Sequence, residues 1–140
     1  MAKITIGQLT LNIHEFSYPK ASDPFDSDWL NVQVECKTEF ADISFSGVFL
    51  PYSQLAQFGH DVDRLYRSET SVAIFEPLEP SVIIELKKIG NLGGIVFSLE
   101  LEPVLGSAER YVFEFQLDQS FLPEIVSSIK SAMASAEAQE

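Results

Sequence analysis

The dominant pattern along the chain is an alternation of apolar and polar residues with a period of two. Such alternation places successive side chains on opposite faces of a β-strand. It begins near six positions: Leu9, Leu30, Ile43, Val82, Ile95 and Tyr111; in addition, Val72–Phe75 is a short apolar run. Residues 1–6 lead directly into the first of these segments. The sequence therefore predicts seven or eight strands, most of them with one solvent-exposed face.

Most connections between these segments are too short to contain a crossover helix, so the sheet is expected to be largely antiparallel. Gly90–Gly94 has the composition of a tight turn, and Pro103–Ala108 that of a longer one. Pro19–Ser27 has the least pattern and is expected to form an exposed loop.

Two segments change to the 3.6-residue period of an amphipathic helix. The apolar positions of the first are Leu55, Phe58, Val62, Leu65 and Tyr66, after a start near Pro51 or Ser53. Those of the second are Leu122, Ile125, Val126, Ile129 and Met133, with Ser120 as the expected N-cap. The predicted fold is α+β, with a largely antiparallel sheet of seven to eight strands covered by two amphipathic helices.

Length and composition are those of one globular domain. The chain has 140 residues, 46% hydrophobic and 21% charged, so residues 1–140 are expected to form a single α+β domain with a frayed tail at 135–140. The first residues contain no basic region followed by a long apolar run, so no targeting segment is expected. The single cysteine, Cys36, rules out a disulfide framework within the chain and favours a cytoplasmic protein.

The net charge of the chain says most about the partners that it could bind. Nine basic and twenty-one acidic residues give a net charge of −12. This balance disfavours binding to nucleic acid or to anionic membranes, since both require Lys and Arg to neutralise phosphates. Two interpretations stay open: the charge attracts a basic protein partner, or it serves only to keep the protein in solution.

Metal-binding patterns are absent from the sequence. The two histidines, His14 and His60, lie in different predicted elements. Asp23, Asp26 and Asp28 cluster before Trp29, but they lack the spacing and the glycine of a calcium loop, so a solvated loop is the preferred interpretation. We therefore expect no metal and no cofactor.

Signals for catalysis are equally weak. Cys36 falls on the apolar face with Val32 and Val34, where a thiol behaves as a small hydrophobic group. Ser46 lacks the glycine pattern of a nucleophile elbow, and Gly93–Gly94 lacks the helix and lysine of a phosphate loop. The sequence predicts a non-catalytic protein, with a small enzyme as the least favoured alternative.

Acidic residues gather on the polar face of the last strands. The candidate partner-binding residues are Glu85, Glu100, Glu102, Glu114 and Asp118. Residues 95–140 contain eight acidic and two basic residues, a local net charge of −6. This face either steers a basic partner or is a solvated sheet face that discourages aggregation.

Three aromatic residues have two interpretations each. Trp29, Tyr66 and Tyr111 are candidates for interface anchors, because aromatic residues are enriched at binding hot spots. Packing in the core is the preferred interpretation for all three.

Several short segments together carry a resemblance that extends over almost the whole chain. They are Asp28-Trp29-Leu30-Asn31-Val32, Gly47-Val48-Phe49, Leu55-Ala56-Gln57-Phe58, Ala73-Ile74-Phe75-Glu76, Gly93-Gly94-Ile95-Val96 and the run from Phe113 to Leu122. In this order they resemble the WapI-type family of small bacterial immunity proteins. The Trp-Leu pair and the Asp118-Gln119-Ser120-Phe121-Leu122 junction are its distinctive parts.

The resemblance implies a cytoplasmic protein that binds and neutralises a cognate toxin domain, often a nuclease. It supplies no catalytic residues. An acidic surface would suit such a target, whose own substrate is polyanionic. The alternative from the residues alone is a structural or self-associating cytoplasmic protein, such as a homodimer formed through a sheet edge.

Overall fold

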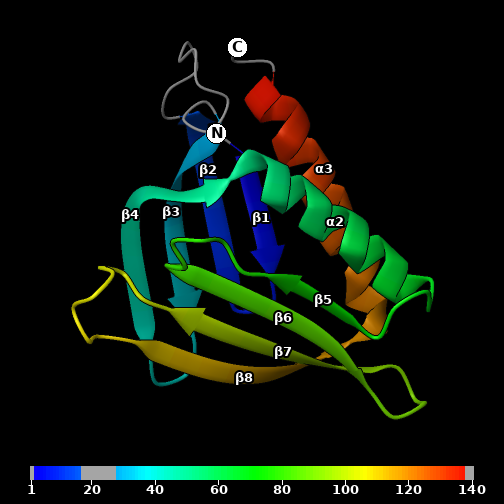
Figure 1. Ribbon diagram of the computed structural model, residues 1–140. Coiled ribbons are helices and arrows are strands. Elements are labelled where there is room, and N and C mark those ends of the chain that lie inside the picture. The colour runs from blue at the N-terminus through cyan, green and yellow to red at the C-terminus, as the bar shows by residue number, and fades with distance from the viewer. Residues whose placement is uncertain (1, 17–27, 138–140) are drawn as a thin grey trace. The chain divides into compact units, whose positions relative to one another are not determined.

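The computed structural model describes residues 2–16 and 28–137, and this part of the chain holds eight strands and two α-helices (Figure 1). The strands are β1 (Ala2–Ile6), β2 (Leu9–Phe16), β3 (Trp29–Lys37), β4 (Asp42–Pro51), β5 (Val72–Phe75), β6 (Val82–Ile89), β7 (Gly94–Leu101) and β8 (Tyr111–Asp118). The helices are α2 (Tyr52–Tyr66), the short 3-10 turn η1 (Gln119–Phe121) and α3 (Leu122–Glu137). The loop expected at Pro19–Ser27 lies outside the described residues.

The α+β class is confirmed, but the expectation of one sheet with seven to eight strands is wrong. The described strands form two antiparallel sheets of four, in the orders β1-β2-β3-β4 and β5-β6-β7-β8. Helix α2 separates β4 from β5 in the sequence. Strands that follow one another directly pair as neighbours, whereas the intervening helix allows β5 to begin a new sheet.

The chain forms two compact units, which are described separately. The first contains residues 1–56 and 127–140, and the second contains residues 57–126. Each unit holds one of the two sheets. That all 140 residues make a single domain stays a prediction.

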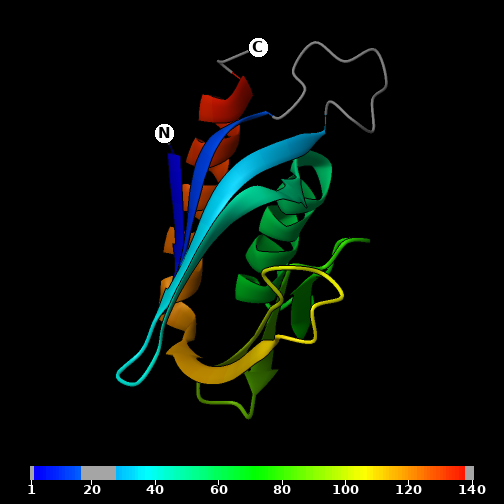
Figure 2. The same ribbon diagram turned by 90° about the vertical axis from the view of Figure 1, so that its left-hand side faces the viewer.

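In the first unit, the sheet of β1 to β4 buries one face of its alternating residues. Gly7, with a positive φ of 52°, makes the turn between β1 and β2, a conformation that glycine adopts without strain. Cys36 is fully buried on the same face as Val32 and Val34, as the alternation predicted. The C-terminal part of α3 runs alongside β1 in both views (Figures 1 and 2).

In the second unit, the sheet of β5 to β8 shows the predicted alternation clearly. Phe97, Leu99 and Leu101 on β7 are fully buried, and the residues between them are half-buried. Phe58 of α2 packs edge-on against Phe75 of β5, with ring centroids 6.0 Å apart. The aromatic contact therefore fixes α2 to β5 within this unit.

Helix α2 begins on a carboxylate supplied from earlier in the chain. The backbone N–H of Ser53 donates to Asp28 Oδ1 at 2.9 Å, and the Ser53 hydroxyl donates to Asp28 Oδ2 at 2.6 Å. First-turn amides have no partner inside a helix, so a carboxylate there stabilises the helix start. Asp28 thus has a structural role, and Asp23 and Asp26 lie outside the described residues.

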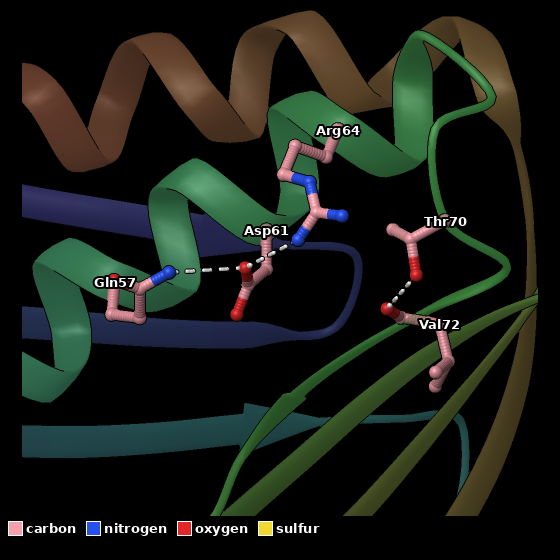
Figure 3. A network of polar contacts seen from close by, with 5 residues as sticks. All are labelled: Gln57, Asp61, Arg64, Thr70 and Val72. Carbon is pink, nitrogen blue, oxygen red and sulfur yellow. Dashed lines mark hydrogen bonds and ion pairs between the residues drawn. The ribbon is translucent and has the colours of Figure 1, made fainter.

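The polar side of α2 satisfies its own groups. Gln57 donates to Asp61 at 3.1 Å, and Arg64 lies 3.8 Å from the same carboxylate (Figure 3). These contacts join residues three and four positions apart, which are neighbours on a helix surface. This side of the helix is a solvated face of self-paired charges.

The start and end of the C-terminal helix differ from expectation. Ser120, the expected N-cap, lies inside the 3-10 turn η1 that leads into α3, and Asp118 caps this turn because its side chain accepts the Ser120 N–H. Helix α3 then continues to Glu137, so residues 135–137, expected to fray, are helical and Ala136 is buried. Alanine has the highest helix propensity, and Ala132 and Ala136 are also buried here.

The three aromatic residues considered as interface anchors differ in their burial. Trp29 is buried, so the core interpretation is confirmed for it. The same interpretation is wrong for Tyr66, which is 46% exposed, because this residue ends α2 just beyond the buried Leu65. Tyr111 is half-buried at the start of β8.

Candidate functional site

The outer face of the second sheet carries most of the predicted acidic residues. This face is the one opposite the buried residues of β6 and β7. Glu85, Glu100 and Glu114 lie on it because each alternates with buried or half-buried apolar neighbours in its own strand. The strand period therefore places all three carboxylates on one side.

The strand register brings these residues close together. Glu85 on β6 pairs with Ser98 on β7, and Ser98 pairs with Glu114 on β8, so the three form one row across the sheet. Glu100 lies in the next row, between Ile83 and Val112. Since neighbouring strands are about 4.8 Å apart, the backbones of Glu85 and Glu114 are roughly 10 Å apart.

A hollow of about 530 Å³ lies over these two rows. We call it the carboxylate hollow. Its lining includes the carboxylates Glu76, Glu85, Glu100 and Glu114 and the apolar side chains Ile83 and Val112. Val112 is 66% exposed, so an apolar surface is open to a partner among the acidic groups. This combination is typical of a protein-binding surface, where apolar area adds affinity and charge adds selectivity.

The five predicted partner-binding residues separate into two groups. Glu85, Glu100 and Glu114 line the carboxylate hollow, whereas Glu102 and Asp118 do not. Glu102 accepts the backbone N–H of Gly106 at 3.0 Å and thereby holds the loop between β7 and β8. Asp118 accepts the Ser120 N–H at 2.9 Å. The structure thus gives Glu102 and Asp118 local structural contacts.

Asp118 gives a testable pH dependence. The N–H of Ser120, and then its hydroxyl, hold the pKa of the Asp118 carboxyl below its ordinary value of 3.8. A lowered folded-state pKa stabilises the fold above the unfolded value, and the stabilisation disappears as the pH falls through the folded value. Asp118→Asn should therefore unfold at a lower temperature than the wild type at pH 7. In thermal scans below about pH 4, the difference in unfolding temperature between the two proteins should shrink progressively. A difference that stays constant as the pH is lowered would contradict the stabilising role of the Asp118 carboxylate.

Two residues of the site were missed by the sequence interpretation. Glu76 directly follows β5 and lines the hollow; it continues the alternation of Val72 and Ile74, a signal that was available. Arg110 lies before β8, and its guanidinium is 2.8 Å from Glu100 Oε2. This hydrogen bond raises the pKa of Arg110. No sequence pattern indicated that pair, because the two residues meet only through the β7–β8 connection.

The charge of this outer face is unbalanced. Glu100 is neutralised in part by Arg110, whereas Glu85 and Glu114 make no hydrogen bond or ion pair with any other described residue. Among the strand residues of this face, Lys87 is the one basic side chain. Two carboxylates without an ion-pair partner, on residues whose backbones are roughly 10 Å apart, produce a negative potential that reaches about one Debye length into solution.

Other chemistry is sparse in residues 2–16 and 28–137. His14 and His60 are both exposed, on β2 and α2, and this part of the chain contains no group of three His, Cys, Asp or Glu arranged to hold a metal. Burial raises the pKa of the Cys36 thiol, which disfavours the reactive thiolate. None of the helices described here has the length and apolarity needed to cross a membrane.

Comparison with known proteins identifies a family. The model of the immunity protein WapI-like family matches residues 2–136 of the chain. No curated protein and no solved structure is significantly similar to it. The match covers both sheets and the two α-helices almost completely.

Proposed function

Because the chain belongs to the immunity protein WapI-like family, we propose that it binds a cognate toxin domain and neutralises it through the carboxylate hollow. Family membership indicates an immunity-type role. The proposal adds the surface that performs it, the basic character of the toxin and the absence of a catalytic step.

The observation that carries this proposal is the composition of the carboxylate hollow. Glu85 and Glu114 make no ion pair with any described side chain, and the exposed Val112 lies in the neighbouring row of the same hollow. A partner with lysine or arginine side chains would supply the missing counter-charge. Charge complementarity of this kind accelerates association and disfavours partners with the wrong charge.

A nuclease toxin fits these requirements. Its active surface must be basic, because binding a nucleic acid requires Lys and Arg to neutralise phosphates. An acidic protein competes for the same side chains, so occupying that surface blocks the toxin without any chemical reaction. This mode of action requires no cofactor. We place it in the cytoplasm, where such a toxin meets its substrate and where a free, buried Cys36 is stable.

The test is protection by co-expression. The chain is used to capture its partner from the native host, and the captured toxin domain is then expressed with and without the chain. We expect growth to be restored when both are present, because the toxin is held in a stoichiometric complex. The absence of a basic toxin domain among captured proteins, together with unchanged toxicity on co-expression, would refute the proposal.

A further inference from the structure

Strand β8 forms an outer edge of the second sheet. One hydrogen bond shows which of its residues bond to β7 and which point away from it. The N–H of Gln119 donates to the carbonyl of Gly93 at 2.8 Å, just beyond the pair Gly94–Asp118. In an antiparallel ladder, hydrogen-bonded and non-bonded pairs alternate. The residues whose N–H and C=O point away from the sheet are therefore Val112, Glu114, Gln116 and Asp118.

The other sheet edges of the described chain are protected in ways that β8 is not. Strand β1 has five residues and contains Lys3, and β4 has a register shift and ends in Pro51. Strand β5 has four residues, and the Thr70 hydroxyl donates to the outward carbonyl of Val72 at 3.2 Å (Figure 3). Short length, lysine, proline and bulges all discourage strand addition. Strand β8 has eight residues in uninterrupted register and none of these features.

The side chains of β8 are incompletely covered on both faces. Phe113, Phe115 and Leu117 point to the buried side of the sheet but are only half-buried, whereas their neighbours on β7 are fully buried. On the other face, Glu114 and Gln116 are exposed. A strand added beside β8 would complete the burial of Phe113, Phe115 and Leu117. On the other face, its side chains would lie next to the carboxylate of Glu114.

From this geometry we propose that β8 accepts an extended segment of the toxin as a fifth strand of the sheet. This inference rests on the proposed function and specifies the partner's recognition element. In the added strand, residues paired with Glu114 and Gln116 share the outer face and are lysine or arginine. The residues between them contact Phe113 and Phe115 and are apolar. The recognition element is thus a strand in which basic and apolar residues alternate.

Charge favours this partner over a second copy of the chain. Strand β8 carries Glu114 and Asp118 and no basic residue. Pairing two β8 strands would collect four carboxylates at one junction, between two chains that each have a net charge of −12. Like charges across a strand pair are destabilising. A basic segment removes that repulsion and supplies partners for Glu114.

The first test uses a defined probe. The probe is a capped peptide of alternating lysine and valine with the eight-residue length of β8, and the control alternates glutamate and valine. Amide exchange is followed by NMR on the ¹⁵N-labelled full chain. We expect the lysine peptide to slow exchange at Val112, Glu114 and Gln116 and to leave the already bonded Phe113 and Phe115 unchanged. Protection confined to other residues, protection in the free protein through self-association, or no protection would overturn the inference.

The second test removes one outward amide. Gln116→Pro deletes an N–H that points away from β7, and the matched control Gln116→Thr changes the side chain but keeps the N–H. We expect the proline variant to bind the lysine peptide at least about tenfold more weakly, and the threonine variant to bind like the wild type. Equal affinity of both variants, with unfolding curves that show both to be folded, would refute strand addition.

Failure of this inference and failure of the proposed function give different results. If Gln116→Pro binds the captured toxin as tightly as Gln116→Thr does, while the wild type protects cells, strand addition is wrong and toxin neutralisation stands. If the peptide protects the β8 amides but no toxin is neutralised, the strand-addition site stands and the proposed function is wrong. A proline variant that does not fold leaves the amide-exchange result on the wild type to decide.

Discussion

Replacing Glu85 and Glu114 together by lysine should slow association with the captured toxin domain about 10- to 100-fold at low ionic strength. The reason is that the carboxylate hollow then presents positive charge to a basic partner. Association rates are measured by stopped-flow fluorescence or surface plasmon resonance at several salt concentrations. The wild-type rate should fall as salt rises, because ions screen the attraction, and the variant should lose this dependence.

A control with the same overall charge separates local from global effects. Glu39→Lys with Glu69→Lys changes the net charge by the same amount, and both positions are exposed and outside the hollow. We expect this variant to retain most of the wild-type association rate. Equal slowing by both variants would show that net charge alone matters and that the carboxylate hollow serves only solubility.

Phe97→Ala should lower the free energy of unfolding by about 3–5 kcal/mol. Phe97 is fully buried in the middle of β7, and its ring lies 5.5 Å from that of Phe115 on β8. Removing the ring leaves a cavity that surrounding strands fill only in part, and the melting temperature should fall by roughly 10–20 °C. Urea unfolding and thermal scans measure both quantities.

The matched control is Phe40→Ala. This substitution makes the same chemical change at a residue that is 92% exposed, so we expect an effect below about 0.5 kcal/mol. Comparable losses at both positions would contradict the assignment of Phe97 to the core.

The carboxylate hollow and the edge of β8 share residues. Val112 and Glu114 line the hollow, and their backbone groups also point away from the sheet. A strand bound at β8 would therefore place its basic side chains beside the hollow. One partner segment can in this way use the backbone for affinity and the carboxylates for selectivity, a division common where an extended peptide adds to a sheet.

Not every carboxylate on this side of the sheet serves the same purpose. Glu102 and Asp118 accept backbone N–H groups of Gly106 and Ser120, and Glu100 is paired with Arg110. These contacts organise the two ends of β8. The acidic cluster that was visible in the sequence thus contains both structural carboxylates and uncompensated ones, and only the second kind is suited to attract a partner.

The sequence by itself determined the strands, both amphipathic helices and the side of each strand that is buried. Period-two and period-3.6 patterns are local properties, and burial of one face follows directly from them. The alternation alone predicted that Cys36 is buried on the same face as Val34, and the structure shows it buried there. The same periodicity placed Glu85, Glu100 and Glu114 on one face of the sheet before any pairing was known.

Only the tertiary structure decided how the strands pair. The division into two four-stranded sheets, the row that joins Glu85 to Glu114 and the contact of Arg110 with Glu100 all depend on register. Register is set by long-range contacts, and a periodic sequence fits several pairings equally well. For the same reason the sequence identified the acidic residues but not which of them line the hollow, and it gave no sign that β8 is the unprotected edge.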